Sequence, residues 1–380
     1  MDLADAFTAA LTEHQAGRLA EAERGYRAIL AEATHLTALH NLALILEATG
    51  RSDEAGQVYR QAADAAPDDP KPQAALATHL RETRQFEAAE PAYRRTLELA
   101  PDYPNAALDL GMVLLATGRF AEGWPLYEQR RARLQMLQRN LTIPEWRGEP
   151  LAGKRLFIWR EQGYGDQIMM ARFLSRLAAA SVSYAGPPAL QRLFSRLPAE
   201  FIAVGAEGIK VSQYDYWTLP LSLPHWLGVT PETAASPPYL TGEAVKAGGR
   251  IGVVWRGEAQ NRNDRFRSLP PELGAELLAL PGAVSLDPAD SGAADFQATA
   301  DIIAGLDLVI TVDTAVAHLA GAMGRPVWVL LAKHAIDWQW PREGVSPWYP
   351  SARLFTQSRA GDWAPVVAAV KAEALRLSPS

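Results

Sequence analysis

A repeat in the first third of the chain constrains its fold more than any other feature. A six-residue segment recurs with spacings of 33, 34 and 34 residues, at positions 17–22, 50–55, 84–89 and 118–123. A tyrosine stands four residues after each segment: Tyr26, Tyr59, Tyr93 and Tyr127. A fixed period of this length indicates stacked helical pairs, because each unit can bury its apolar face only against its neighbours.

Other columns keep the same period. They are Leu42, Leu76 and Leu110 before the turns, and Pro67 and Pro101 at the ends of two units. These residues resemble the tetratricopeptide repeat over residues 3–133, in about four units, and imply an α-solenoid with its tyrosines in the core. Stacked repeats expose a concave groove, so we expect a domain that binds a protein segment there.

The stretch after the repeats is less regular. Arg130-Arg131-Ala132-Arg133 is interpreted as a solvated basic turn, because the formal net charge of −6 argues against nucleic-acid binding. Residues 134–150 form a predicted linker in which Trp146 pins the two parts together. The chain has no Cys and no H-x-x-x-H pair, so a metal held by the protein is not expected.

From residue 151 the pattern changes to short apolar runs with helical segments between most of them. The runs are 155–159, 181–185, 201–204, 216–219, 251–255, 284–286, 306–312 and 327–331. This alternation predicts parallel sheets covered by helices. Residues 231–249 divide the region into two unequal Rossmann-like α/β halves, 151–230 and 250–376, with a ligand cleft at the carboxyl ends of the strands.

The loop after the first strand is the first candidate for chemistry. Gly163 and Gly165 would let the backbone approach a ligand, and Asp166 would project a carboxylate into the cleft. Asp166 is also suited to capping the helix that we expect to reach about Ala180, and capping does not exclude catalysis. The missing third glycine of G-x-G-x-x-G argues against a dinucleotide site.

A second candidate lies where the run 306–312 meets a helix. Asp313 and Thr314 stand at the junction, and a helix that begins there offers free N–H groups to a phosphate. His318 lies four residues after Thr314 and so on the same helix face. It is interpreted either as a second donor to that anion or as a buried histidine, the commoner role of a lone histidine.

The third candidate is the loop 255–270, which holds four Arg in twelve residues beside amides and a serine. Arg pairs well with phosphate, so the loop is interpreted as a pyrophosphate clamp or, alternatively, as a solvated loop. No D-x-D pair follows a strand, so a Mg²⁺-bridged sugar nucleotide is not favoured.

Together the three loops resemble the bacterial heptosyltransferase-like glycosyltransferases, whose two facing Rossmann-like halves form the GT-B architecture. The resemblance covers roughly 151–375 and is carried by three motifs, Glu161-Gln162-Gly163-x-Gly165-Asp166, Asn263-Asp264-x-x-Arg267-Ser268 and Asp313-Thr314-x-x-x-His318-Leu319-Ala320. It implies Asp166 as the general base. It implies a metal-independent donor site without a cofactor, made of Gly163, Gly165, Arg267, Ser268, Asp313, Thr314, Ala315, Val316 and His318.

The fused repeats make the chain similar to transferases that modify proteins, among them flagellin glycosyltransferases. We therefore expect transfer of a sugar from a nucleotide-activated donor to a Ser or Thr hydroxyl of a protein captured by the repeats. Two alternatives stay open: a non-catalytic adaptor with a degenerate transferase fold, and a lipopolysaccharide heptosyl-type transferase. The family usually has glycine where Ala315 stands, and the segment Pro281 to Asp295 is short, which would weaken or remove the donor site.

The location follows from two absences. No apolar run approaches the roughly 18 to 20 residues of a membrane helix, and the first residues lack the cationic start of a signal peptide. A soluble, cytoplasmic protein without an integral membrane segment is expected.

Overall fold

The computed structural model describes residues 2–134, 141–205, 208–245, 250–258, 260, 264–334, 337–341 and 346–377. Contacts divide the chain into two compact units, Met1–Thr117 and Gly118–Ser380.

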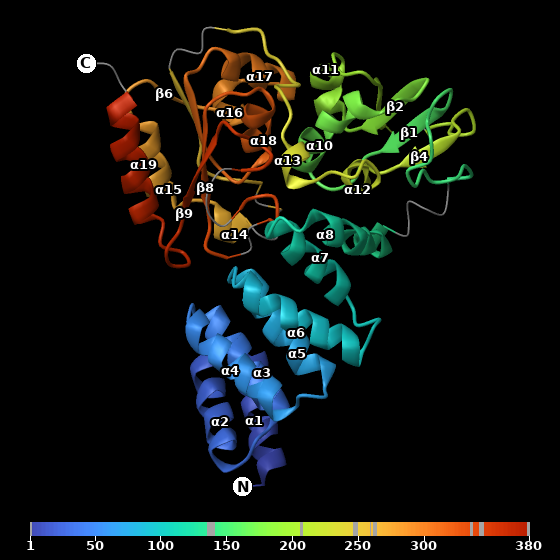
Figure 1. The fold of residues 1–380 in the computed structure, drawn as a ribbon. Helices are drawn as coiled ribbons and strands as arrows, with labels where there is room; N and C mark the ends of the chain where they lie inside the picture. Colours follow the sequence, from blue (N-terminus) through green and yellow to red (C-terminus); the bar gives the residue numbers. More distant parts are fainter. Residues whose placement is uncertain are drawn as a thin grey trace. The chain divides into compact units, whose positions relative to one another are not determined.

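The first unit is helical, as the repeat predicts. Its described helices are α1 (Leu3–Gln15), α2 (Leu19–Glu32), α3 (Leu36–Ala48), α4 (Ser52–Ala65), α5 (Pro70–Glu82), α6 (Phe86–Leu99) and α7 (Ala106–Ala116). Each helix packs on the next one along the chain, and Figure 1 shows them in blue to teal. Tyr26, Tyr59 and Tyr93 are buried at these contacts, which confirms their role in the core.

The first position of each repeated segment has a left-handed backbone. The φ angles are 75° at Gly17, 78° at Gly50, 60° at Arg84 and 80° at Gly118. Glycine adopts this conformation at no steric cost, whereas an L residue with a side chain does so at about 1 kcal/mol. The recurring glycine of the repeat therefore encodes the turn between the two helices of a unit.

The helix α8 (Phe120–Tyr127), which carries the fourth repeated segment, belongs to the second unit. Phe120 stacks on Trp348 with ring centroids 5.6 Å apart, and Trp124 and Tyr127 each lie 5.4 Å from Trp338. Our boundary at residue 133 follows the repeat in the sequence. The compact unit ends earlier, because these aromatic side chains find their core in the α/β region.

The second unit contains two parallel sheets, as predicted. The first has the order β3-β2-β1-β4, and the second the order β6-β5-β7-β8-β9. Their strands are β1 (Arg155–Trp159), β2 (Ser181–Gly186), β3 (Glu200–Ala203), β4 (Tyr216–Thr218), β5 (Ile251–Val254), β6 (Ala283–Ser285), β7 (Leu308–Val312), β8 (Val327–Leu331) and β9 (Ala352–Thr356). The edge strand β9 is absent from our sequence prediction.

Helices cover both faces of the second sheet (Figure 1). Inward side chains of β5, β7 and β8 form one core with α15 (Pro271–Leu278) and α19 (Ala364–Leu377). On the other face α18 (Ala315–Ala322) contacts β7 and β8, and α17 (Phe296–Ala304) contacts α18. Both strands that precede the candidate loops are therefore held in a packed layer.

The first sheet is covered on one face by the predicted linker. Leu141 and Ile143 pack on the core around Phe157 and Trp217. The backbone N–H of Trp146 donates to the carbonyl oxygen of Trp217 over 2.8 Å, so the linker continues beside the edge strand β4. Trp146 is thus buried against the first half.

Short helices complete the second unit. They are α10 (Tyr164–Met170), α11 (Gln191–Phe194), α12 (Leu223–Trp226), α13 (Pro231–Ala234), α14 (Asp264–Arg267) and α16 (Pro288–Ser291), and the 3₁₀ helices η1 (Glu128–Leu134), η2 (Ala171–Arg176), η3 (Pro188–Leu190) and η4 (Pro220–Ser222). The helix that we expected to reach Ala180 changes to 3₁₀ geometry after Met170. Among the described residues, no helix is both long and apolar enough to cross a membrane.

Candidate active site

The start of α10 presents the first carboxylate. Gly163 is the N-cap, and Oδ2 of Asp166 accepts a hydrogen bond from the Gly163 backbone N–H over 3.1 Å. Asp166 remains partly exposed, so capping leaves an oxygen for other contacts. Desolvation and the neighbouring carboxylate of Asp337, with smaller contributions from Glu161 and Asp313, raise the pKa of Asp166 to about 8.

The start of α18 presents the second carboxylate, that of Asp313. Thr314 is the N-cap, and residues 313–316 are partly exposed. Oδ1 of Asp313 accepts a hydrogen bond from the indole N–H of Trp340 over 2.8 Å. Burial raises the pKa of Asp313, although this hydrogen bond and the nearby Arg267 oppose the rise. Asp313 is therefore already bonded within the chain.

Gly165 brings these two helix starts together. A Cβ atom built on Gly165 would lie 2.7 Å from Cδ2 of His318 and 3.5 Å from Cα of Ala315. Any side chain would push α10 away from α18. Gly165 thus serves close helix packing, whereas Gly163 is exposed and has only Asp166 near its own Cβ position.

The structure favours the second of our two interpretations of His318, that of a buried histidine. It is buried, with Nδ1 at 3.1 Å from the Tyr349 hydroxyl and Nε2 at 3.3 Å from Nε2 of Gln339. Its ring stacks on Trp340 at 5.2 Å. Desolvation, aided by the charge of Arg172, lowers the pKa of His318 to about 3. His318 is a neutral core residue, and both its nitrogens face protein groups instead of a phosphate.

Arg267 reaches the residue before the start of α18, whereas Ser268 bonds within its own loop. Nη1 of Arg267 donates to the backbone oxygen of Asp313 over 2.9 Å, and its Nε donates to Oδ1 of Asp264 over 3.3 Å. The Ser268 hydroxyl donates to the same Asp264 oxygen and accepts from the N–H of Gly257, both over 2.9 Å. The bond from Arg267 fastens the loop to the residue after β7, and the other bonds join residues of the loop to one another.

The four-arginine clamp is not assembled by the described residues. Arg256 pairs with Asp287 over 2.7 Å, away from Asp313, and Arg265 lies over the ring of Phe266. Arg262 and the motif residue Asn263 lie outside the described residues. Arg267 is thus the described arginine of this loop that reaches α18.

A shallow pocket of about 300 Å³ adjoins this loop. It lies at the ends of β8 and β9, and its lining includes Ser268, Gln357 and Trp363. Asp166 does not line it. The pocket therefore lies beside the loop that carries Arg267 and Ser268, and it does not include the carboxylate of Asp166.

Sequence reasoning missed the segment Asp337–Trp340. Trp340 bonds Asp313, Gln339 contacts His318, and Trp338 packs on α8. The segment follows β8 at the carboxyl edge of the sheet, and two tryptophans around an amide are an unusual composition for a solvated loop. Both signals are visible in the sequence.

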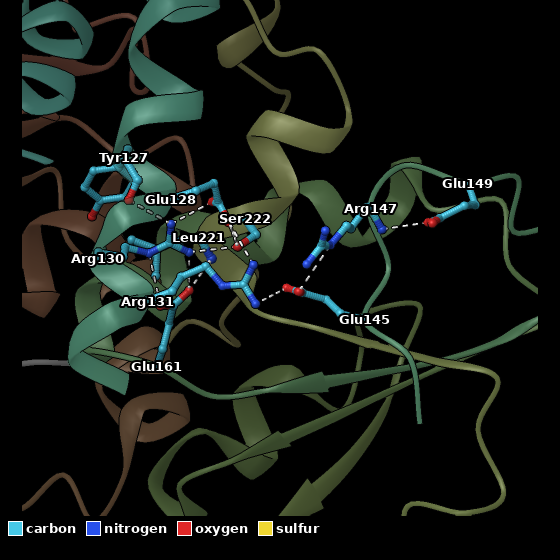
Figure 2. A network of polar contacts seen from close by, with 10 residues as sticks. All are labelled: Tyr127, Glu128, Arg130, Arg131, Glu145, Arg147, Glu149, Glu161, Leu221 and Ser222. Carbon is cyan, nitrogen blue, oxygen red and sulfur yellow. Dashed lines mark hydrogen bonds and ion pairs between the residues drawn. The ribbon is translucent and has the colours of Figure 1, made fainter. Parts of the chain in front are cut away.

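A buried polar network was also missed (Figure 2). The Arg130 side chain is 4% exposed and pairs with the fully buried Glu161 over 2.9 Å. Arg131 pairs with Glu145 and lies over the Trp217 ring. Arg130 and Arg131 of the turn that we expected to be solvated are therefore packed into the α/β unit, because Glu161 and Glu145 offset their charges.

Comparison with known proteins supports both parts of this reading. Residues 38–73 and 74–133 match models of the tetratricopeptide repeat. Residues 252–356 match the model of glycosyltransferase family 9 (heptosyltransferase). Protein FlbA of Caulobacter vibrioides is 26% identical over 292 residues, which are 61% of this chain and 48% of FlbA. The chain thus spans about half the length of this relative.

Solved structures resemble the chain over about a third of its length. MamA AMB-1 is 18% identical with a TM-score of 0.33 and covers 36% of this chain and 74% of its own. MamA 41-end from Desulfovibrio magneticus RS-1 is 16% identical with a TM-score of 0.32 and covers 37% and 78%. The sequence motifs, the two parallel sheets and the family matches lead to one assignment. The chain joins N-terminal tetratricopeptide repeats to a C-terminal glycosyltransferase family 9 (heptosyltransferase) domain.

Proposed function

We propose that the protein transfers a sugar from a nucleotide-activated donor to a Ser or Thr hydroxyl of a protein acceptor. One observation carries the proposal: Asp166, with its raised pKa, stands at the start of α10, and Gly165 packs that helix start against the start of α18. A base and an anion-binding helix end are thereby brought close together.

In the proposed reaction Asp166 takes the proton of the acceptor hydroxyl. The hydroxyl oxygen forms a bond to the anomeric carbon as the bond from that carbon to the donor phosphate oxygen breaks. A base with a pKa near the working pH is suited to this step, because it is partly deprotonated and still binds a proton well. A pKa of about 8 for Asp166 meets that condition.

The departing nucleotide takes the negative charge. The first N–H groups of a helix have no partner inside it, so the backbone of Ala315 and Val316 and the hydroxyl of Thr314 are suited to hold the phosphates. Arg267, fixed to Asp313, adds positive charge nearby. We propose that these groups act without a metal ion or cofactor.

The repeats favour a protein acceptor. Tetratricopeptide repeats present a concave groove for a peptide segment, and a transferase of small molecules has no need for one. We propose that a cytoplasmic protein, flagellin being one candidate, binds there and offers its hydroxyl to Asp166.

Thermal unfolding in the presence of UDP-, ADP- and CMP-linked sugars tests donor binding. A donor that binds the folded state raises the melting temperature by mass action. At a donor concentration of one hundred times its Kd, the free energy of unfolding increases by about 2.7 kcal/mol. Intact-mass measurement of partner proteins, purified with and without this protein, tests transfer. A discrete added mass identifies both acceptor and sugar.

A specific observation favours a second function, that of a non-catalytic adaptor. Asp313 is bonded to Trp340, His318 is enclosed, and Arg267 is bonded to the backbone and to Asp264. Polar groups that we expected to bind the nucleotide-sugar are therefore already hydrogen-bonded within the chain. No stabilisation by any of the three nucleotide-sugar classes, together with no added mass, would establish the adaptor instead of the transferase.

A further inference from the structure

We propose that Arg130, from the segment that follows the repeats, is a positioning residue that holds the loop Glu161-Gln162-Gly163 and thereby fixes the place of Asp166 at the start of α10. The inference rests on the proposed function for its catalytic consequence. Its structural part concerns contacts within the second unit alone.

Glu161 is the anchor of the loop. It comes two residues after β1, and its side chain is fully buried. Oε1 accepts hydrogen bonds from Nη2 of Arg130 and from the backbone N–H of Leu221, each over 2.9 Å. Oε2 accepts from Nε of Arg130 over 3.2 Å. Both oxygens are thus held, and Arg130 grips the carboxylate with two donors.

Arg130 has no donor left for other work. Nη2 also donates to the Ser222 hydroxyl over 2.9 Å, and Nη1 donates to Oε1 of Glu128 over 2.7 Å and to the backbone oxygen of Tyr127 over 3.3 Å. Five bonds match the five N–H groups of a guanidinium. Figure 2 shows Arg130 between Glu128, Ser222 and Glu161. A guanidinium so fully bonded fixes the position of its partners as well as its own.

The next residue shows why the loop needs such anchoring. Gln162 has a φ of 55°, in the left-handed region that residues other than glycine avoid. Its Nε2 donates to the Tyr127 hydroxyl over 3.3 Å, which adds a second attachment to the helix segment that carries Arg130. A strained backbone persists only where its surroundings determine it, and here both attachments come from residues 127–130.

The geometry of Asp166 follows from this loop. Asp166 lies five residues after Glu161 and bonds the N–H of Gly163. A loop released from Arg130 would relax at Gln162 and carry Gly163 and the start of α10 with it. In the proposed function the donor is held at α18, so the loss would affect the transfer step more than donor binding.

The experiment compares four variants of the full chain. Arg130→Met leaves Glu161 as an unpaired buried charge, whereas Arg130→Met/Glu161→Gln removes both charges and should recover much of the stability. Arg130→Lys keeps the charge but loses the two-donor grip. Arg147→Met is the matched control, because Arg147 is exposed and pairs with Glu145 at 3.6 Å.

Hydrogen–deuterium exchange gives a readout that needs no substrate. In the double variant we expect the amides of residues 161–167 to exchange about tenfold faster, while those of β7 keep their wild-type rates. Arg130→Lys should lie between, and Arg147→Met should match wild type. Unchanged exchange of 161–167 in the double variant overturns the proposal. If the amides of β7 exchange faster by the same factor, Arg130 only stabilises the whole unit, and the proposal is also overturned.

Kinetics with the donor that stabilises wild type gives the second readout. We expect kcat of the double variant to fall about 10- to 100-fold, with the donor KM unchanged and with partial rescue in Arg130→Lys. A double variant with wild-type kcat also overturns the proposal. If wild type transfers no sugar, the proposed function fails and the exchange experiment still decides whether Arg130 positions the loop.

Discussion

The starts of α10 and α18 share one local design and differ in what surrounds it. Each follows a buried parallel strand, and each has an aspartate at or near the junction, Asp166 in the first and Asp313 in the second. The two helices pack on each other through Gly165. From the sequence alone, both junctions are candidate sites.

The surroundings separate them. Asp166 and Asp313 are both partly exposed, but Asp166 bonds one backbone N–H, whereas Asp313 accepts from the indole N–H of Trp340 and lies beside Arg267. His318, one turn into α18, is closed in by Tyr349 and Gln339. The polar side chains of the second junction therefore bond mainly to other parts of the chain, whereas Asp166 bonds only within its own loop.

The largest effect should follow from neutralising Asp166. Asp166→Asn keeps the size of the side chain and loses the base, so we expect transfer to fall by about 100- to 10,000-fold while donor binding is retained. Steady-state kinetics and donor titration measure the two effects. Asp313→Asn is the matched control at the other junction, and it should change kcat by less than about threefold. Equal losses in both variants would erase the difference between the junctions.

The pH dependence sharpens the same comparison. Because the pKa of Asp166 is raised to about 8, kcat/KM should increase about tenfold per pH unit below that value and level off above it. The same shift lowers stability as pH rises from about 4 to 8, since the unfolded chain loses this proton first. Asp166→Asn should remove both trends. A rate that is flat between pH 6 and 9 would contradict the role of Asp166 as base.

The periodic features of this fold are predictable from sequence because local rules determine them. The 34-residue columns fix the buried tyrosines, and Gly17 and Gly50 fix the turns through their positive φ. The apolar runs predict eight of the strands and their arrangement in parallel sheets. β9 is missed although it is as long as β7 and β8, because the exposed Arg353 and Thr356 interrupt its apolar run.

The partners of each element are not predictable in this way. Tyr127 keeps the column of Tyr26 and Tyr59, yet it packs on Trp338 from the loop after β8. The sequence predicts Arg130 as a surface residue, because it does not show that the buried Glu161 lies beside it. Asp166 and the start of α18 were predicted as site residues from strand ends alone, whereas the enclosure of His318 depends on side chains from a distant loop.

Replacing His318 tests whether the second junction is structural. His318→Ala leaves a cavity between Tyr349 and Trp340, so we expect a loss of about 2–3 kcal/mol in urea unfolding at pH 7 with unchanged donor affinity. Because the pKa of His318 is lowered to about 3, the wild type loses stability as pH falls below about 6.5, where the unfolded histidine is protonated. That loss should shrink in the variant. A marked fall in donor affinity with little change in stability would instead restore His318 as a phosphate donor.

The smallest effect should come from Trp340. Trp340→Phe keeps a ring against His318 but removes the N–H that bonds Oδ1 of Asp313, so we expect a loss of about 1–2 kcal/mol, seen as a lower melting temperature. The loss should be smaller in the Asp313→Asn background, because an amide there carries no charge that needs the donor. If the two substitutions add independently in a double-mutant cycle, the bond contributes nothing to holding the second junction. A coupling near 1 kcal/mol would show that the bond from Trp340 stabilises Asp313 in its place, a contact for which Asp166 has no counterpart at the first junction.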